Sequence, residues 1–239
     1  MRISRIVMAS IISTPVTDVA DTQALLRLTN WLSPSYPVGA FSYSHGLEQA
    51  VAQGDVRDAD STQDWLEYIL RHGAGRTDAI FLSHAWRAVS QQDTARLEEV
   101  AELASAFFPC AERRLEAMGQ GEAFLRVTAK VWPAPDIRRM PMPHAVAVGA
   151  FAGVYGSDLE TTLALYLQSF LSNLVFAAIR LVPLGQTEGQ RIVAALHPAI
   201  LSVVTEAMEA DPDDVGGCAF LADLAAMDHE TLETRLFRT

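Results

Sequence analysis

The stretch "LETTLALYLQSFLSNLVFAAIRLVPL" (residues 159–184) decides the fold class, because its length and apolar character fit two different structures. A helix that spans a membrane needs about 20 mainly apolar residues. Here Gln168, Ser169, Ser172 and Asn173 stand in the middle of the run. These polar side chains favour a long helix in the core of a helical protein over a membrane span.

Helical periodicity continues on both sides of this central segment. Apolar residues between positions 97 and 104 follow the i, i+3, i+4, i+7 spacing of one helix face. "STQDWLEYILRHG" (61–73) begins with a cap signal, Ser61 followed three residues later by Asp64, and ends with a stop signal at Gly73. Alternating β-branched runs bounded by turns are absent from the sequence. We therefore predict an all-α protein.

Two turn-rich segments separate groups of predicted helices. "WPAPDIRRMPMPH" (132–144) contains four prolines, and "ADPDDVGG" (210–217) is an acidic turn. Because the helices on both sides of the proline-rich segment are too apolar to stand alone, we expect a single multi-helix bundle of roughly ten helices with one long loop. The expected helices cover residues 22–32, 44–53, 61–73, 77–90, 97–104, 110–130, 144–155, 159–182, 188–196, 199–209 and 217–227.

Composition narrows the classes of function. The net charge of −11 repels phosphate backbones, so we expect no nucleic-acid partner. Cys110 and Cys218 are too few for a disulfide framework or a structural zinc site, which favours the reducing cytoplasm. "MRISRIVMASIISTP" (1–15) has only a short apolar run and no good cleavage site. A flexible N-terminal arm over residues 1–20 is therefore favoured over a signal peptide.

Sequence motifs of enzymes do not fit this chain. Lys130 is the only lysine and is not part of a phosphate-binding loop. The six histidines form neither H-x-H nor H-x-x-x-H, so no two of them share a helix face locally. A metal site built from distant residues, or between two chains, stays open. We predict no catalytic residue, no cofactor and no metal ligand.

The segment "SPSYPVGAFSYSHGLE" (33–48) is the strongest candidate for a functional loop. Ser44 and His45 are adjacent, which is the wrong geometry for a nucleophile and its base on a helix. The simpler interpretation is that Ser42 and Ser44 cap a helix and that His45 lies on its face.

Recognition is the other possible role of this loop. Its prolines stiffen the chain, and Tyr36, Phe41 and Tyr43 offer large contacts of low conformational entropy. A single ring of this kind is more often part of the core. Whether all three face a partner or fill the core stays open from the sequence.

Three segments of the chain resemble the signatures of the urease accessory protein UreF family. These are the loop at 33–48, "RLVPLGQTEGQR" (180–191) and the tail "HETLETRLFRT" (229–239), in the order and spacing of that family. The resemblance covers roughly residue 22 to the C-terminus. Asp228 departs from it, where a basic residue is expected, and residues 110–126 fit only loosely. His45 stands at a position that varies in the family.

The resemblance implies an all-α homodimer in the cytoplasm with no chemistry of its own. Such proteins bind the scaffold UreD (also called UreH), recruit the GTPase UreG, and help load nickel into apo-urease. An all-helical domain at 21–227 would then be followed by a partner-binding tail at 228–239 that folds only on docking. The alternatives are a nickel-carrying metallochaperone and a helical enzyme with a site at 33–48. The residues expected at partner surfaces are Tyr36, Phe41, Tyr43, Glu48, Gln186, Glu188, Arg235, Leu236, Phe237 and Arg238.

Overall fold

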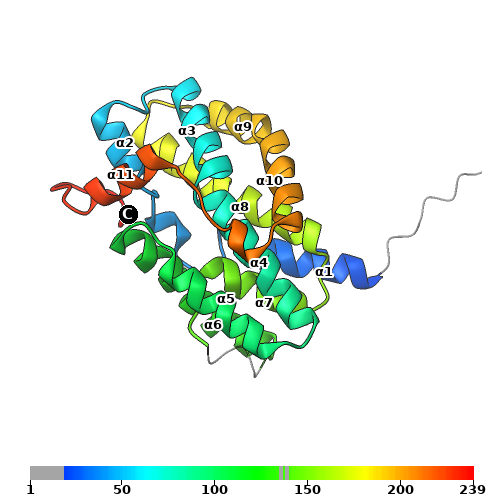
Figure 1. Ribbon diagram of the computed structural model, residues 1–239. Helices are drawn as coiled ribbons and strands as arrows, with labels where there is room; N and C mark the ends of the chain where they lie inside the picture. The colour runs from blue at the N-terminus through cyan, green and yellow to red at the C-terminus, as the bar shows by residue number, and fades with distance from the viewer. Residues whose placement is uncertain (1–18, 135–136, 138–139) are drawn as a thin grey trace, which may run out of the picture.

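The computed structural model describes residues 19–134, 137 and 140–239, and all regular structure in these ranges is helical (Figure 1). The predicted all-α class is confirmed. The predicted N-terminal arm lies outside the described residues, apart from its last two positions. The α-helices are α1 (Val19–Trp31), α2 (Leu47–Gln53), α3 (Ala59–His72), α4 (Ala74–Ser90), α5 (Thr94–Ala106), α6 (Ala111–Val131), α7 (His144–Val154), α8 (Leu159–Leu181), α9 (Gln186–Ala195), α10 (His197–Glu209) and α11 (Phe220–His229), with 3-10 turns at Ala40–Ser42 and Pro212–Asp214.

Helix α8, the segment that decides the fold class, lies at the centre of the bundle and packs against α1, α2, α3, α4, α7, α9 and α10. Its mid-helix polar side chains find partners inside the protein: the Ser169 hydroxyl donates to the carbonyl of Leu32 at 2.8 Å. By length and composition alone, Leu159–Leu181 and Gln186–Glu209 could each cross a membrane. Core helices pass the same test, and the position of α8 among seven neighbouring helices is that of a core helix.

Helices α4 and α7 approach each other closely because α7 carries small residues on the contact face. A Cβ atom at Gly149 would lie 2.3 Å from the carbonyl oxygen of Leu82, and one at Gly153 would lie 2.8 Å from that of Trp86. Every residue from Ala145 to Ala152 is buried. The apolar sequence of α7 therefore fits a helix with neighbours on all sides.

An aromatic cluster attaches α1 to this core. The indole of Trp31 makes edge-to-face contacts with Phe124, Trp132, Phe151 and Tyr155, with ring centroids 5.5–6.3 Å apart. Such pairs contribute about 0.5–1.5 kcal/mol each beyond the area that they bury. Trp31 therefore fixes the end of α1, from which the loop at 33–48 departs.

The start of α3 corrects one prediction. The cap is Asp58 and not Ser61: the Asp58 carboxylate accepts from the Ser61 amide at 2.9 Å, and the Ser61 hydroxyl accepts from the Asp58 amide at 3.1 Å. This reciprocal capping box places Ser61 in the first turn of the helix, so the helix begins at Ala59. Asp58 supplies one acceptor of the capping box and Ser61 supplies the other, so Asp64 is not part of the cap.

The proline-rich loop between α6 and α7 packs against the helices. Ala134, Ile137 and Met142 are buried in the main apolar core. Gly121 of α6 allows the loop to pass close by, because a Cβ there would lie 2.0 Å from the Met142 carbonyl oxygen. The described part of this loop is therefore packed into the bundle through these buried side chains.

Candidate functional site: the junction of the loop and the C-terminal tail

The loop at 33–48 and the C-terminal tail lie side by side, although they come from opposite ends of the described chain. Figure 1 shows the C-terminal end next to α2 and α11. The Ser44 amide donates to the Thr239 carbonyl at 2.8 Å, and the Arg238 amide donates to the Ser42 carbonyl at 2.8 Å. The last two residues of the chain therefore pair with the loop through their backbones.

The loop reaches this position through residues with left-handed backbone conformations. Gly39 and Gly46 have φ angles of 78° and 77°, and His45 has a φ of 62°. Gly46 also permits close packing, since a Cβ there would lie 2.8 Å from the backbone nitrogen of Ala226 in α11. Only glycine combines this φ with this contact at low cost.

The structure corrects the predicted positions of His45 and Ser42, which lies at the end of the 3-10 turn Ala40–Ser42, whereas Ser44 does make a capping contact with the first turn of α2. Helix α2 begins at Leu47, so His45 stands in the turn before the helix, with its ring buried. Ser44 bonds to the Thr239 carbonyl, and its hydroxyl accepts from the Glu48 amide at 3.3 Å. Since Ser44 contacts the tail while His45 points toward Glu116, the pair lacks the geometry of a nucleophile and its base.

The three rings of the loop have different environments. Tyr36 and Tyr43 are each 8% exposed, and the Tyr36 hydroxyl pairs with the Thr128 hydroxyl at 2.7 Å. Phe41 is 74% exposed. The structure thus places two of the rings in the core of this chain and one on its surface, where it is free to contact a partner.

The tail is folded against the body, which differs from the expectation of a segment that is ordered only on docking. Phe237 is 4% exposed, and the Arg180 guanidinium lies over its ring at 4.5 Å from the centroid. The amides of Leu236 and Phe237 donate to the two carboxylate oxygens of Glu48 at 2.7 and 2.9 Å. Leu236 is 53% exposed, and Arg238 is also exposed. Glu48, predicted as a surface residue for a partner, therefore binds the tail of its own chain.

The three segments that carry the family resemblance meet in one apolar cluster. Leu47 belongs to the loop segment at 33–48, Val182 to the segment at 180–191, and Phe237 to the tail, and all three are buried together. In the middle segment, the Gly185 amide donates to the Glu188 carboxylate at 2.9 Å, so Glu188 caps α9. Gln186 is exposed at the start of the same helix.

A second set of contacts joins α11, α6 and the tail, and the sequence did not predict it. His229 is fully buried, with Nδ1 2.7 Å from Glu112 and Nε2 3.3 Å from Glu48. Arg235 donates to the same Glu112 carboxylate at 2.6 Å. Glu112 lies in the segment that fits the family only loosely, and acidic residues on either side of His229 gave no sign of its partners.

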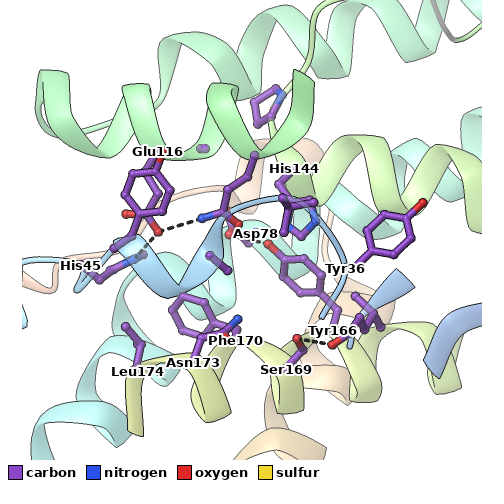
Figure 2. A pocket seen from close by; sticks show the side chains of 18 of the residues that line it. Tyr36, His45, Asp78, Glu116, His144, Tyr166, Ser169, Phe170, Asn173 and Leu174 are labelled. Atoms are coloured by element: carbon purple, nitrogen blue, oxygen red, sulfur yellow. Dashed lines mark hydrogen bonds and ion pairs between the residues drawn. The ribbon is translucent and has the colours of Figure 1, made fainter. Parts of the chain in front are cut away.

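Beneath the junction lies a cavity of about 60 Å³ that is lined by both polar and apolar side chains (Figure 2). His45 points toward Glu116, with 3.5 Å between Nδ1 and the carboxylate, and Tyr166 donates to Asp78 at 2.8 Å. Arg113 also donates to Glu116. The Thr239 hydroxyl reaches Glu116 at 2.8 Å, so the end of the tail touches the polar groups of the cavity.

Burial and pairing set the protonation states around this cavity. Burial raises the pKa of Asp78 to about 6 and lowers that of His144 to about 4. Burial, followed by the charge of Arg113, lowers the pKa of His45 to about 4. Burial alone would raise the pKa of Glu116, but Arg113 and His45 hold it at about 2. At neutral pH the Arg113–Glu116 ion pair therefore lies beside neutral imidazoles and an Asp78 carboxyl that has mostly lost its proton. Removing one partner of such a buried ion pair is strongly destabilising, because it leaves the other charge unpaired.

The described residues contain no group of three histidine, cysteine or acidic side chains arranged to hold a metal ion. The described residues combine an all-helical bundle with a loop–tail junction and exposed apolar side chains such as Phe41 and Leu236. Exposed aromatic and apolar side chains of this kind are typical of surfaces that bind other proteins. Comparison with known proteins identifies the particular family.

The UreF family model matches residues 56–197. The chain is 50% identical over 222 residues to the urease accessory protein UreF of Rhodopseudomonas palustris strain BisB5, covering 90% of this chain and 91% of the relative. The corresponding protein of Bradyrhizobium sp. strain BTAi1 is 45% identical over 233 residues (95% and 97%), and that of Mesorhizobium japonicum is 46% identical over 226 residues (94% and 100%). The chain therefore belongs to the UreF family, as predicted, and is an accessory factor rather than an enzyme.

Proposed function

We propose that this chain is a nickel-insertion chaperone for urease that acts in the cytoplasm as a homodimer. In this proposal it bridges the scaffold UreD/UreH and the GTPase UreG while the nickel centre of apo-urease is assembled. The relatives named as urease accessory proteins support the process. Contacts with proteins, and neither nucleic acid nor membrane, are its means of action.

One observation carries the proposal: the loop and the tail form a composite surface with buried anchors and exposed contact residues. Tyr36, Tyr43 and Phe237 are buried, whereas Phe41 and Leu236 are exposed next to them. Full burial of such a side chain contributes about 1.5–3 kcal/mol. Rigid anchors beneath exposed apolar groups reduce the entropy lost on binding, which is the usual character of an interface hot spot.

Arg235 has a different role in this proposal from a simple contact with a partner. Its guanidinium already donates to Glu112 and to the carbonyls of Leu232 and Glu230, at 2.6–2.8 Å. About a third of its side chain stays exposed. We infer that Arg235 mainly fixes the turn of the tail and offers only its outer edge to UreD. The exposed Arg238 is better placed for a forked contact with a carboxylate.

Capture of this chain by immobilised UreD tests the proposal. Arg235→Ala, or deletion after His229, is expected to abolish capture, and Phe41→Ala to weaken it. Glu233→Ala is the matched control, because Glu233 is an exposed tail residue for which the structure gives no hydrogen bond or ion pair. Full capture of the truncated chain would remove the tail from the interface. Sedimentation of the free protein as a monomer at working concentration would contradict the homodimer.

Two further measurements separate the alternatives. Equilibrium dialysis of the purified chain with nickel distinguishes a scaffold from a carrier, since a carrier binds the ion stoichiometrically when alone. Turnover of GTP by UreG, with and without this chain in the assembled complex, shows whether the chain stimulates, restrains or only positions the GTPase. Hydrolysis of a small substrate by the purified chain would favour an enzyme with a site at residues 33–48.

A further inference from the structure

Three side chains from three different helices converge on the base of the tail. Glu48 comes from α2, Glu112 from α6, and His229 from the end of α11. The His229 ring stands between the two carboxylates, at 2.7 Å from Glu112 and 3.3 Å from Glu48. Each carboxylate also binds the tail: Glu112 accepts from Arg235, and Glu48 accepts from the amides of Leu236 and Phe237.

The donors and acceptors of these side chains define how His229 and Arg235 can bind the two carboxylates. A neutral imidazole donates from one nitrogen only, and a carboxylate only accepts, so both contacts of His229 are satisfied when both ring nitrogens carry hydrogen. The Arg235 guanidinium faces the same Glu112 carboxylate and supplies a permanent positive charge beside it. Glu230 does not compete, because its carboxylate accepts from the Ala111 amide at the start of α6 at 3.0 Å. Asp228 points to Gln53 at 3.3 Å.

We propose that Glu48, Glu112 and His229 form an ionic clamp that positions the tail. The three residues are positioning residues: they fix the peptide at Leu236 and Phe237 and thereby decide which side chains face outward. The part of this proposal that concerns partners rests on the proposed function. The part that concerns the tail does not, because it is a property of the isolated chain.

Burial explains why the clamp controls the tail as a unit. His229 is fully buried and Glu48 nearly so, and Glu112 is largely shielded. Charge-assisted hydrogen bonds are about twice as strong as neutral ones in such surroundings. Removal of one charge leaves its partner buried without compensation, which costs more than the lost contact itself. A single uncharged substitution at Glu112 therefore weakens the hold on Arg235 and on His229 together.

Hydrogen exchange in the full chain, without any partner, tests the clamp. The readout is the exchange rate of the Leu236 and Phe237 amides, whose acceptor is Glu48 and not the mutated residue. In Glu112→Gln we expect these two amides to exchange about tenfold faster or more, with no change in the amides of the α8 core. Glu233→Gln, with the same loss of charge in the tail, is expected to exchange as the wild type does.

Two controls separate a positioning role from general destabilisation. Unchanged exchange in α8 shows that Glu112→Gln is folded; if this variant does not fold, Arg235→Gln is measured in its place, and it is expected to speed the same two amides. In the double variant Glu112→Gln/Arg235→Gln the two effects are expected to be less than additive, because the two residues share one contact. Equal exchange of the wild type and the clamp variants at Leu236 and Phe237 would overturn the clamp.

Capture by UreD then distinguishes the clamp from the proposed function. If Glu112→Gln loosens the tail and lowers capture at least tenfold while Glu233→Gln does neither, both proposals are supported. If the tail loosens but capture is unchanged, the clamp stands and its positioning role for a partner is wrong. If the wild type itself is not captured, the proposed function fails, while the exchange result still decides the clamp.

Discussion

The anchoring of the tail by one buried ring leads to a sharp prediction. Phe237 is 4% exposed, lies among the side chains of Leu47 and Val182, and is covered by the guanidinium of Arg180. Replacing a buried phenylalanine with alanine costs about 3–5 kcal/mol in a protein core. The tail, however, is a terminal segment that can detach while the bundle stays folded, so the loss is expressed as local opening.

The size of the effect follows from this cost. A loss of about 3 kcal/mol corresponds to a change of roughly a hundredfold in the equilibrium between attached and detached tail. In Phe237→Ala we expect the amides of Leu236 and Arg238 to exchange about a hundredfold faster and carboxypeptidase to remove the C-terminal residues rapidly. The melting temperature of the bundle should change little, because α8 and its neighbours keep their contacts.

Leu236→Ala is the matched control for this experiment. Leu236 precedes the anchor but is 53% exposed, so truncation leaves no cavity and tail exchange should stay near that of the wild type. The control should still lower capture by UreD, since it removes an exposed apolar contact. Slow tail exchange in Phe237→Ala would refute the reasoning, because the buried ring would then not be what holds the tail.

Three other predictions concern the bundle. Gly149→Ala places a Cβ 2.3 Å from the carbonyl oxygen of Leu82 and is expected to destabilise the protein by about 1–3 kcal/mol in urea unfolding; an unchanged midpoint would show that α4 and α7 can separate at low cost. Asp58→Ala removes the α3 cap and should lower the melting temperature by about 2–4 °C, whereas Asp64→Ala should have little effect. The pKa of Asp78 is raised to about 6, so the folded state binds this proton more tightly than the unfolded state does. The stability of the wild type should therefore fall relative to that of Asp78→Asn as the pH rises from about 4 to about 6. A constant difference in stability over this range would show that the carboxyl is not desolvated.

Helix positions were predictable because periodicity and end signals are local. All eleven expected helices are found among the described residues, with ends shifted by a few positions. The choice between a membrane span and a core helix for residues 159–184 also depended on a local signal, because polar residues inside this segment indicated a core helix. The error at α3 arose because the spacing of Ser61 and Asp64 imitates a capping box, whereas the reciprocal pair forms between Asp58 and Ser61.

The candidate site was predictable in its segments but not in its contacts. Whether Tyr36 fills the core depends on Thr128, a residue 92 positions away. The clamp pairs His229 with Glu112 across 117 positions, and no pattern in a single sequence links such residues. The conformation of His45, with its positive φ, is likewise fixed by packing beneath the tail and not by its own preference.

The geometry of the tail explains why it needs fixing at both ends. Along its last four residues burial alternates: Leu236 and Arg238 are exposed, whereas Phe237 and Thr239 are buried. Because burial alternates, a shift of one residue along the tail would bury the arginine and expose the ring. The clamp holds one end through the amides of Leu236 and Phe237, and the contacts of Thr239 with Ser44 and Glu116 hold the other. Fixing both ends selects a single register, and with it the side chains that a partner meets.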